Sequence, residues 1–167
     1  MSMRNDHDSD TPDHEQRPRL VELEPQTTAV VRGAVPLGEL RTFFDEAFGA
    51  LGRVLQRQQI PPKSAAFGLS HGGPGETLDL EVGFVTERKV SAEDGVVAGG
   101  LPGGRVARMT HRGGFDGLAE AWERLGDWIR AQGLRGGEDR WEVYVTRPTP
   151  GMDPRDLRTE LNWPIAD

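Results

Sequence analysis

A chain of 167 residues with 35% hydrophobic content suits one domain, or two small related halves that share a core. Its formal net charge of -7 argues against nucleic acid as a partner, because such binding depends mainly on Lys and Arg that neutralise phosphates. Cysteine is absent and the four histidines form no spaced ligand cluster, so we expect no disulfide, no metal and no cofactor. No apolar run approaches the length of a membrane span, which predicts a cytoplasmic protein without a membrane partner.

The first part of the chain predicts an acidic tail followed by a β-α-β-β unit. Residues 1–19 carry almost no apolar side chains, so we expect them to be disordered. A kinked strand is expected over residues 20–32, which are rich in β-branched side chains. Apolar residues at steps of three and four predict a helix over residues 37–58, and two strands are expected at 65–69 and 78–85.

The same order of elements returns after a glycine-rich segment. Residues 90–104 are the loosest interior stretch, and we expect them to connect two halves of the domain. A strand over residues 105–111, a helix over 115–132 and strands over 141–146 and 157–163 complete the second half.

The two halves, at about 20–88 and 104–165 of one domain spanning 20–166, also share residue spacing. A shift of 74 positions, the separation of Phe67 from Trp141, superimposes the apolar stripe of one helix on that of the other. We therefore predict an α+β fold of two β-α-β-β modules, each with one long helix on an antiparallel sheet. The matched pairs include Phe44/Leu118, Ala47/Ala121, Phe48/Trp122, Leu51/Leu125 and Leu55/Ile129.

One acidic residue stands where a strand would not favour it. Glu142 lies between Trp141 and Tyr144 in a segment that otherwise alternates like a strand. The alternation places Val143 with Val145, and we expect these two to meet the helix, which leaves Glu142 and Tyr144 on the opposite face, in the seam between the halves. A carboxylate beside aromatic rings suits a delocalised organic cation, and it could also act as a general acid or base. The alternative is a half-exposed strand with Glu142 in water.

Three other residues carry both a functional and a structural interpretation. Glu81 is a candidate second acid, or part of a solvated strand face. Trp163 could close the pocket wall or fill the core, and His111 could be a base or a structural residue at the end of a strand.

The order and spacing of several segments resemble a known family. These segments are Thr28–Gly33, Asp79–Phe84, His111–Phe115, Trp141–Tyr144 and Glu160–Leu161, and together they extend over nearly the whole chain. The chain resembles the GyrI-like, or bacterial transcription activator effector-binding (SOUL/SHS2-type), small-molecule-binding domains.

The resemblance implies two modules related by a pseudo-two-fold axis, with a pocket at their junction that binds bulky aromatic, often cationic compounds. The family's central acid would be Glu142, with Trp141 and Tyr144 as aromatic neighbours. Phe115 stands where many members have a tyrosine after Gly-Pro, so the ring is retained in the pocket wall and its hydroxyl is lost.

The resemblance also ranks three functions. The first is a stand-alone, multidrug-type binding protein that sequesters such compounds and confers resistance. The second is a hydrolase that opens cyclopropane-type DNA-alkylating natural products, with Glu142 as its acid/base. The third is a protein that interacts with gyrase and modulates it.

Overall fold

The structure is a computed structural model that describes residues 17–72, 76–146 and 150–166. Most of the predicted tail therefore lies outside the described residues, although Arg19 already belongs to the first strand. The tip of the predicted turn after His71 also lies outside them. No described helix is long and apolar enough to cross a membrane, and the described residues include no group of three or more His, Asp or Glu arranged to hold a metal ion.

The first part of the chain forms the predicted kinked strand, helix and pair of strands, followed by one further strand. The kink expected in the strand over residues 20–32 is a break at residues 24–25, which separates β1 from β2. The elements are β1 (Arg19–Leu23), β2 (Gln26–Pro36), the short 3-10 helix η1 (Leu37–Glu39), α2 (Leu40–Gln58), β3 (Phe67–His71), β4 (Thr77–Val85) and β5 (Val96–Leu101).

The second half repeats this order. Its helix again begins with a 3-10 turn, and a two-residue strand is added after it. The elements are β6 (Gly104–Arg112), η2 (Phe115–Gly117), α3 (Leu118–Ala131), β7 (Arg135–Gly136), β8 (Asp139–Tyr144), η3 (Pro154–Asp156) and β9 (Arg158–Ala166).

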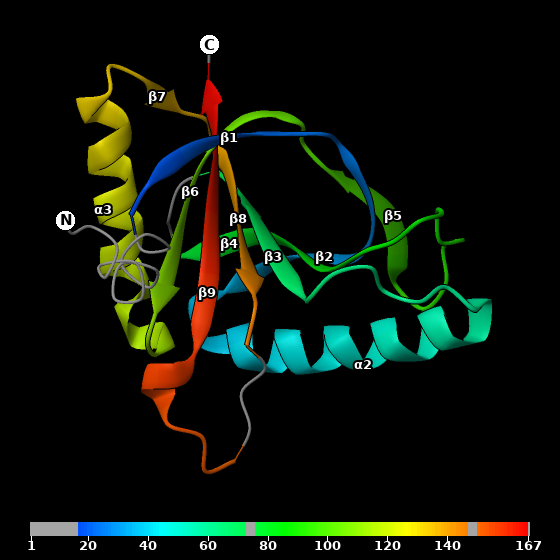
Figure 1. Cartoon of the computed structure of the whole chain (residues 1–167). Helices are drawn as coiled ribbons and strands as arrows, with labels where there is room; N and C mark the ends of the chain where they lie inside the picture. Colours follow the sequence, from blue (N-terminus) through cyan, green and yellow to red (C-terminus); the bar gives the residue numbers. More distant parts are fainter. Residues whose placement is uncertain (1–16, 73–75, 147–149, 167) are drawn as a thin grey trace, which may run out of the picture.

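One antiparallel sheet joins both halves. Its order is β1-β6-β9-β8-β3-β4-β2-β5, with β7 paired to β9 off this path. The halves meet where β3 pairs with β8 and also where β1 pairs with β6. β5, which lies between the two halves in the chain, pairs with β2. Figure 1 shows the curved sheet with α2 along its lower side and α3 standing beside β6. The predicted α+β fold is confirmed.

The segment expected to connect the two halves contains a strand, β5, that was not predicted. Val96–Leu101 pairs with β2 over six residues. Two glycines in this strand lower its β-propensity, and the partner that stabilises it lies about seventy residues earlier in the chain.

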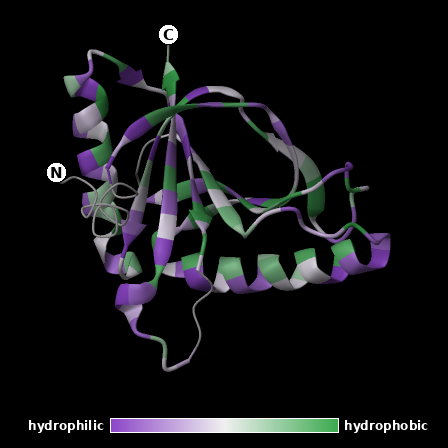
Figure 2. Ribbon diagram, viewed as in Figure 1, coloured by the Kyte–Doolittle hydropathy of each residue, from purple (hydrophilic) through white to green (hydrophobic). Residues whose placement is uncertain are grey.

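The equivalent stripes of the two helices are buried, as the repeat predicts. Ala47 and Leu51 in α2 correspond to Ala121 and Leu125 in α3, and all four are at most 3% exposed. Figure 2 shows hydrophobic and hydrophilic residues alternating along both helices. The stripe of α2 packs on β2 and β5, and that of α3 packs on β6 and β9.

The sheet register shows that both helices cover the same face and that Glu142 lies on it. Leu161 packs against α3 and is paired with Glu142, which is in turn paired with Gly68. Gly68 is paired with Val82, and Val82 is paired with Val31, which packs in the cluster under α2. Paired residues point to the same side of a sheet, so Glu142 faces the helices.

The expected orientation of this strand is therefore reversed. Glu142 and Tyr144 do share a face, but it is Val143 and Trp141 that point away from the helices. They join Phe67 and Leu69 in a third apolar cluster on the helix-free side of the curved sheet. That side is filled by side chains of both halves, so the pocket at the junction opens on the helix side instead.

Candidate functional site

A large pocket lies on the helix side of the sheet, where the two halves meet. Its volume is about 1920 Å³, which exceeds the roughly 300–1,000 Å³ of ordinary ligand sites. It runs along α2 and is bounded by β3, β4, the end of β8 and the start of α3. The aromatic rings in its wall are Phe44, Phe48, Phe84, Phe115 and Tyr144.

Glu142 belongs to the pocket wall and is fixed by two hydrogen-bond donors. The indole Nε1 of Trp122 donates to its Oε2 at 2.7 Å, and the hydroxyl of Tyr144 donates to its Oε1 at 3.1 Å. The indole N–H can only donate, so Glu142 is the acceptor. A carboxylate has about four acceptor positions, and two therefore remain for a ligand.

A glycine makes room for the phenol of Tyr144. Gly68 is buried under it, and a Cβ at Gly68 would lie 2.9 Å from the Tyr144 hydroxyl oxygen. The rings of Phe44 and Phe115 stand edge-on to Tyr144, each with a centroid distance of 6.2 Å. These contacts hold the hydroxyl towards Glu142.

The environment of Tyr144 keeps its hydroxyl protonated. Burial, the negative charge of Glu142 and the hydrogen bond to that carboxylate raise the pKa of Tyr144 well above its usual 10.0. The phenol is therefore a neutral hydrogen-bond donor throughout the neutral pH range. The negative charge of this pair of side chains is that of Glu142 alone.

Alkaline titration of the parent protein is expected to show this raised pKa directly. Tyr144 is the only tyrosine in the chain, so the ultraviolet absorbance of tyrosinate reports this one site. Its midpoint should lie well above pH 10.0, and the stability that the protonated phenol contributes should be lost as pH rises beyond that value. Phe44→Ala, which removes one covering ring, should lower the midpoint. A midpoint at the usual value in the folded parent would contradict the geometry.

Two of the predicted site residues lie on the other side of the sheet. Trp141 is 3% exposed and fills the helix-free core. Glu81 is also buried there, with its Oε2 2.7 Å from Nε2 of His71 and 3.6 Å from Nε of Arg32. Burial lowers the pKa of His71, but the hydrogen bonds to Glu81 and Asp139 together outweigh this effect, so the pKa is raised above its usual value. Neither Trp141 nor Glu81 lines the pocket.

Two others lie on the helix side but outside the pocket lining. His111 is buried, and its Nε2 is 2.8 Å from the carbonyl oxygen of Gly114, so it closes the turn before α3. Trp163 packs edge-on against Trp122, with ring centroids 5.8 Å apart. Phe115 does line the pocket and is 45% exposed, so the structure brings Glu142, Tyr144 and Phe115 together.

Sequence reasoning missed several residues of this site. Phe44, Phe48 and Phe84 were not predicted as site residues, since an apolar stripe does not distinguish a pocket wall from a filled interior. Trp122 was predicted only as the counterpart of Phe48, and Arg140 was not predicted as a site residue. The available signal for Arg140 was its strand parity, which is that of Glu142.

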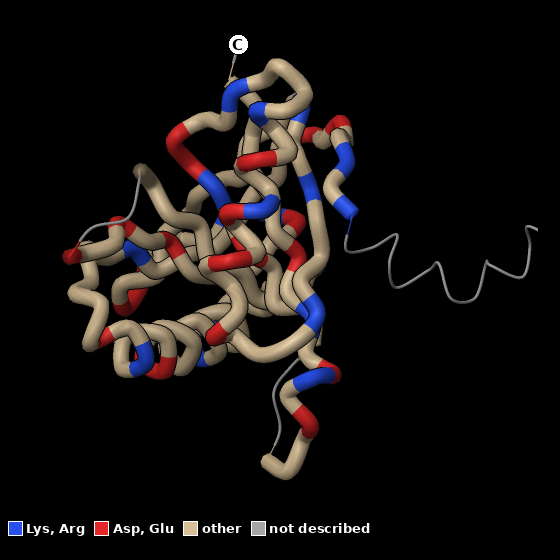
Figure 3. Tube along the Cα trace, turned by 90° about the vertical axis from the view of Figure 1, so that its left-hand side faces the viewer, with Lys and Arg blue, Asp and Glu red and all other residues tan. Residues whose placement is uncertain are grey.

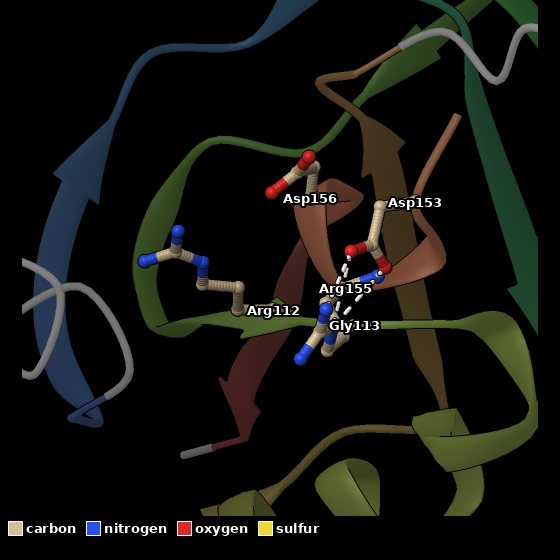
Figure 4. A pocket seen from close by; sticks show the side chains of 5 residues that line it. All are labelled: Arg112, Gly113, Asp153, Arg155 and Asp156. Carbon is tan, nitrogen blue, oxygen red and sulfur yellow. Dashed lines mark hydrogen bonds and ion pairs between the residues drawn. The ribbon is translucent and has the colours of Figure 1, made fainter. Parts of the chain in front are cut away.

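A second hollow is smaller and lined by polar residues. It has a volume of about 460 Å³ and involves Arg112, Gly113, Asp153, Arg155 and Asp156. Figure 4 shows Arg155 hydrogen-bonded to Asp153, with Arg112 pointing away from that pair. Because all four charged side chains are exposed, solvent screens them, and the aromatic pocket is the stronger candidate.

Solved structures with the same fold include proteins of several kinds. The C-terminal domain of EcmrR is 17% identical, with a TM-score of 0.79, and the match covers 90% of this chain and 98% of that one. A hydrolase from Listeria innocua is 14% identical, with a TM-score of 0.65 and 98% of both chains covered. SAV2435 bound to tetraphenylphosphonium is 12% identical, with a TM-score of 0.65, and the match covers 90% of this chain and 94% of that one. At these identities the likeness shows the fold alone.

A structure of EcmrR in a complex with DNA also has this fold. Its EcmrR chain is 18% identical to this chain, with a TM-score of 0.77. The match covers 97% of this chain but only 63% of the EcmrR chain. Figure 3 shows basic and acidic residues interspersed along the described trace. The expectation that nucleic acid is not a partner stays a prediction.

The family follows from the sequence as a whole. No curated protein matches the chain. The family described as GyrI-like small molecule binding domain, however, matches residues 16–166, a range that includes every strand and helix of both halves and every residue of the pocket. The chain therefore belongs to the GyrI-like small molecule binding domain family.

Proposed function

We propose that this protein binds bulky aromatic cations in the pocket between its halves, with Glu142 as the counter-charge. One observation carries the proposal: a carboxylate with two free acceptor positions lies in a wall that contains five aromatic rings. Aromatic faces attract cations through their quadrupoles, and a carboxylate adds a directed Coulomb attraction.

The charges around the pocket favour Glu142 as the group that a cation would meet. Arg41 and Asp45 also line the pocket, but both are exposed and are four residues apart on α2, so solvent screens their fields. Glu142 is half-buried, and its attraction for a bound cation is screened less. The tetraphenylphosphonium held by SAV2435, which shares this fold, is a ligand of the proposed class.

A hydrolase is the second candidate, because Glu142 and the Tyr144 hydroxyl lie together in the pocket wall and could hold a water molecule between protein and substrate. The Listeria innocua hydrolase of the same fold supports this candidate. Both oxygens of Glu142 already accept a hydrogen bond, which favours a role in binding over proton transfer. Turnover of a cyclopropane-bearing alkylating compound by the parent, lost in Glu142→Gln, would establish hydrolysis.

Two probes of the same shape and opposite charge test the proposal. Calorimetric titration should show that tetraphenylphosphonium binds at least tenfold more tightly than tetraphenylborate, because the rings of both fit the aromatic wall but only the cation is attracted by Glu142. Thermal unfolding with each probe gives an independent measurement, since a ligand of the native state raises the midpoint. Equal affinities, or tighter binding of the anion, would refute the proposed charge preference.

A further inference from the structure

Arg140 is an unusual neighbour of Glu142. It lies two residues earlier in β8, on the same face of the sheet. Its guanidinium carbon is 4.9 Å from the ring centroid of Trp122 and 4.8 Å from that of Trp163. The side chain therefore lies against both indole rings, which pack edge-on on each other, and one of which donates the hydrogen bond to Glu142.

Trp163 is held in place by its contacts with three glycines. Trp163 donates from Nε1 to the carbonyl oxygen of Gly137 at 2.8 Å. A Cβ at Gly136 would lie 2.6 Å from Cε2 of Trp163, and a Cβ at Gly126 would lie 3.2 Å from its Cζ3. Only glycine leaves room for the indole at Gly136, so Trp163 has little freedom and neither does the guanidinium that stacks on it.

Among residues 17–72, 76–146 and 150–166, the guanidinium of Arg140 makes no ion pair or hydrogen bond, although its backbone carbonyl accepts a hydrogen bond from the Ser70 hydroxyl at 3.4 Å. The acid that acts on it is Glu142: burial lowers the pKa of Arg140, and the negative charge of Glu142 opposes that shift. The interaction is mutual, so the positive charge of Arg140 is felt at the carboxylate that faces the pocket. The two aromatic faces favour one position of this half-buried guanidinium, so its charge stays near Glu142.

We infer that Arg140 lowers the charge selectivity of the pocket: the rings of Trp122 and Trp163 hold its guanidinium near Glu142, where it offsets part of the attraction that the carboxylate exerts on cations. This inference rests on the proposed function. With Arg140 present, the affinities of the pocket for cationic and for less charged ligands differ less than they would with Glu142 alone. Aromatic compounds that carry a partial or delocalised charge can therefore also bind.

The test compares Arg140→Met, which keeps an apolar stem against the indoles and removes the charge, with Arg140→Lys, which keeps the charge. In Arg140→Met the ratio of tetraphenylphosphonium to tetraphenylborate affinity should rise about threefold to tenfold over the parent, because one positive charge near the carboxylate is lost. In Arg140→Lys the ratio should stay within about twofold of the parent. The affinity for neutral triphenylphosphine oxide should change little in either variant.

Each outcome decides something. An unchanged ratio in Arg140→Met, or a ratio in Arg140→Lys that rises as in the methionine variant, would overturn the inference and leave the proposed function intact. A parent protein that binds neither charged probe would overturn both. A merely structural role would weaken all three probes together and leave the ratio unchanged. Arg140→Gln supplies the same comparison if the methionine variant does not fold.

Discussion

Gly83→Ala is expected to lower the free energy of unfolding by about 3 kcal/mol or more, the largest stability change that the structure indicates for one added methyl group. Gly83 is buried in β4, paired with Val30 of β2 and Phe67 of β3. A Cβ there would overlap the carbonyl oxygen of Ala29 and lie 2.9 Å from both the Ala29 carbonyl carbon and the Val30 Cα. All three are backbone atoms, which cannot move without separating the strands.

Urea denaturation followed by circular dichroism measures this effect. Gly49→Ala is the matched control, because Gly49 is exposed on α2 and a Cβ there would meet only the end of the Arg53 side chain, at 3.5 Å. Alanine inside a helix should stabilise the protein by about 0.5–1 kcal/mol relative to glycine. A Gly83→Ala protein within about 0.5 kcal/mol of the parent would show that β2 and β4 can separate at no cost.

The helices and most strands of this fold could be predicted because they depend on local patterns. The stripe that contains Leu51 in α2 and its counterpart Leu125 in α3 buries the residues that a 3.6-residue period selects. The alternation in β4 places Leu80 and Val82 on the side opposite to Glu81, as observed. Neither inference requires knowledge of the partner strand.

The orientation of β8 could not be predicted in the same way. A period of two assigns Trp141 and Val143 to one face and Glu142 and Tyr144 to the other, but it does not say which face meets the helices. A pair of large apolar side chains satisfies either arrangement. The choice is made by the sheet order, which puts β8 between β9 and β3 and so brings Glu142 within reach of Trp122.

The pairing of β1 with β6 and of β5 with β2 could not be predicted for a related reason. A strand such as Val96–Leu101 has weak local preference and is stabilised by pairing with Gln26–Val31, far away in the chain. The aromatic pocket wall was hidden differently: Phe48 and Phe84, which stack edge-on at 5.7 Å, have the spacing of core residues, and only the unfilled space beside them makes them a wall.

Glu142→Gln is expected to weaken tetraphenylphosphonium binding by about tenfold to a hundredfold, or about 1.4–2.8 kcal/mol. The substitution removes the charge and almost nothing else. The amide oxygen can accept the hydrogen bond from Trp122, whose indole can only donate, and the amide nitrogen then faces the Tyr144 hydroxyl, which can accept as well as donate. The network thus has a neutral form, and the unfolding midpoint should change little.

The matched control is Asp45→Asn, a second loss of one negative charge from the wall of the same pocket. Asp45 is exposed on α2, so solvent and salt screen it, and its loss should weaken the cation by less than about threefold. Affinity for tetraphenylborate should rise slightly in both variants, because each loses a like charge. If the two variants weakened tetraphenylphosphonium equally, the attraction would come from the overall negative charge of the protein. If Glu142→Gln alone does so, the attraction is local to the carboxylate that Trp122 and Tyr144 hold in place.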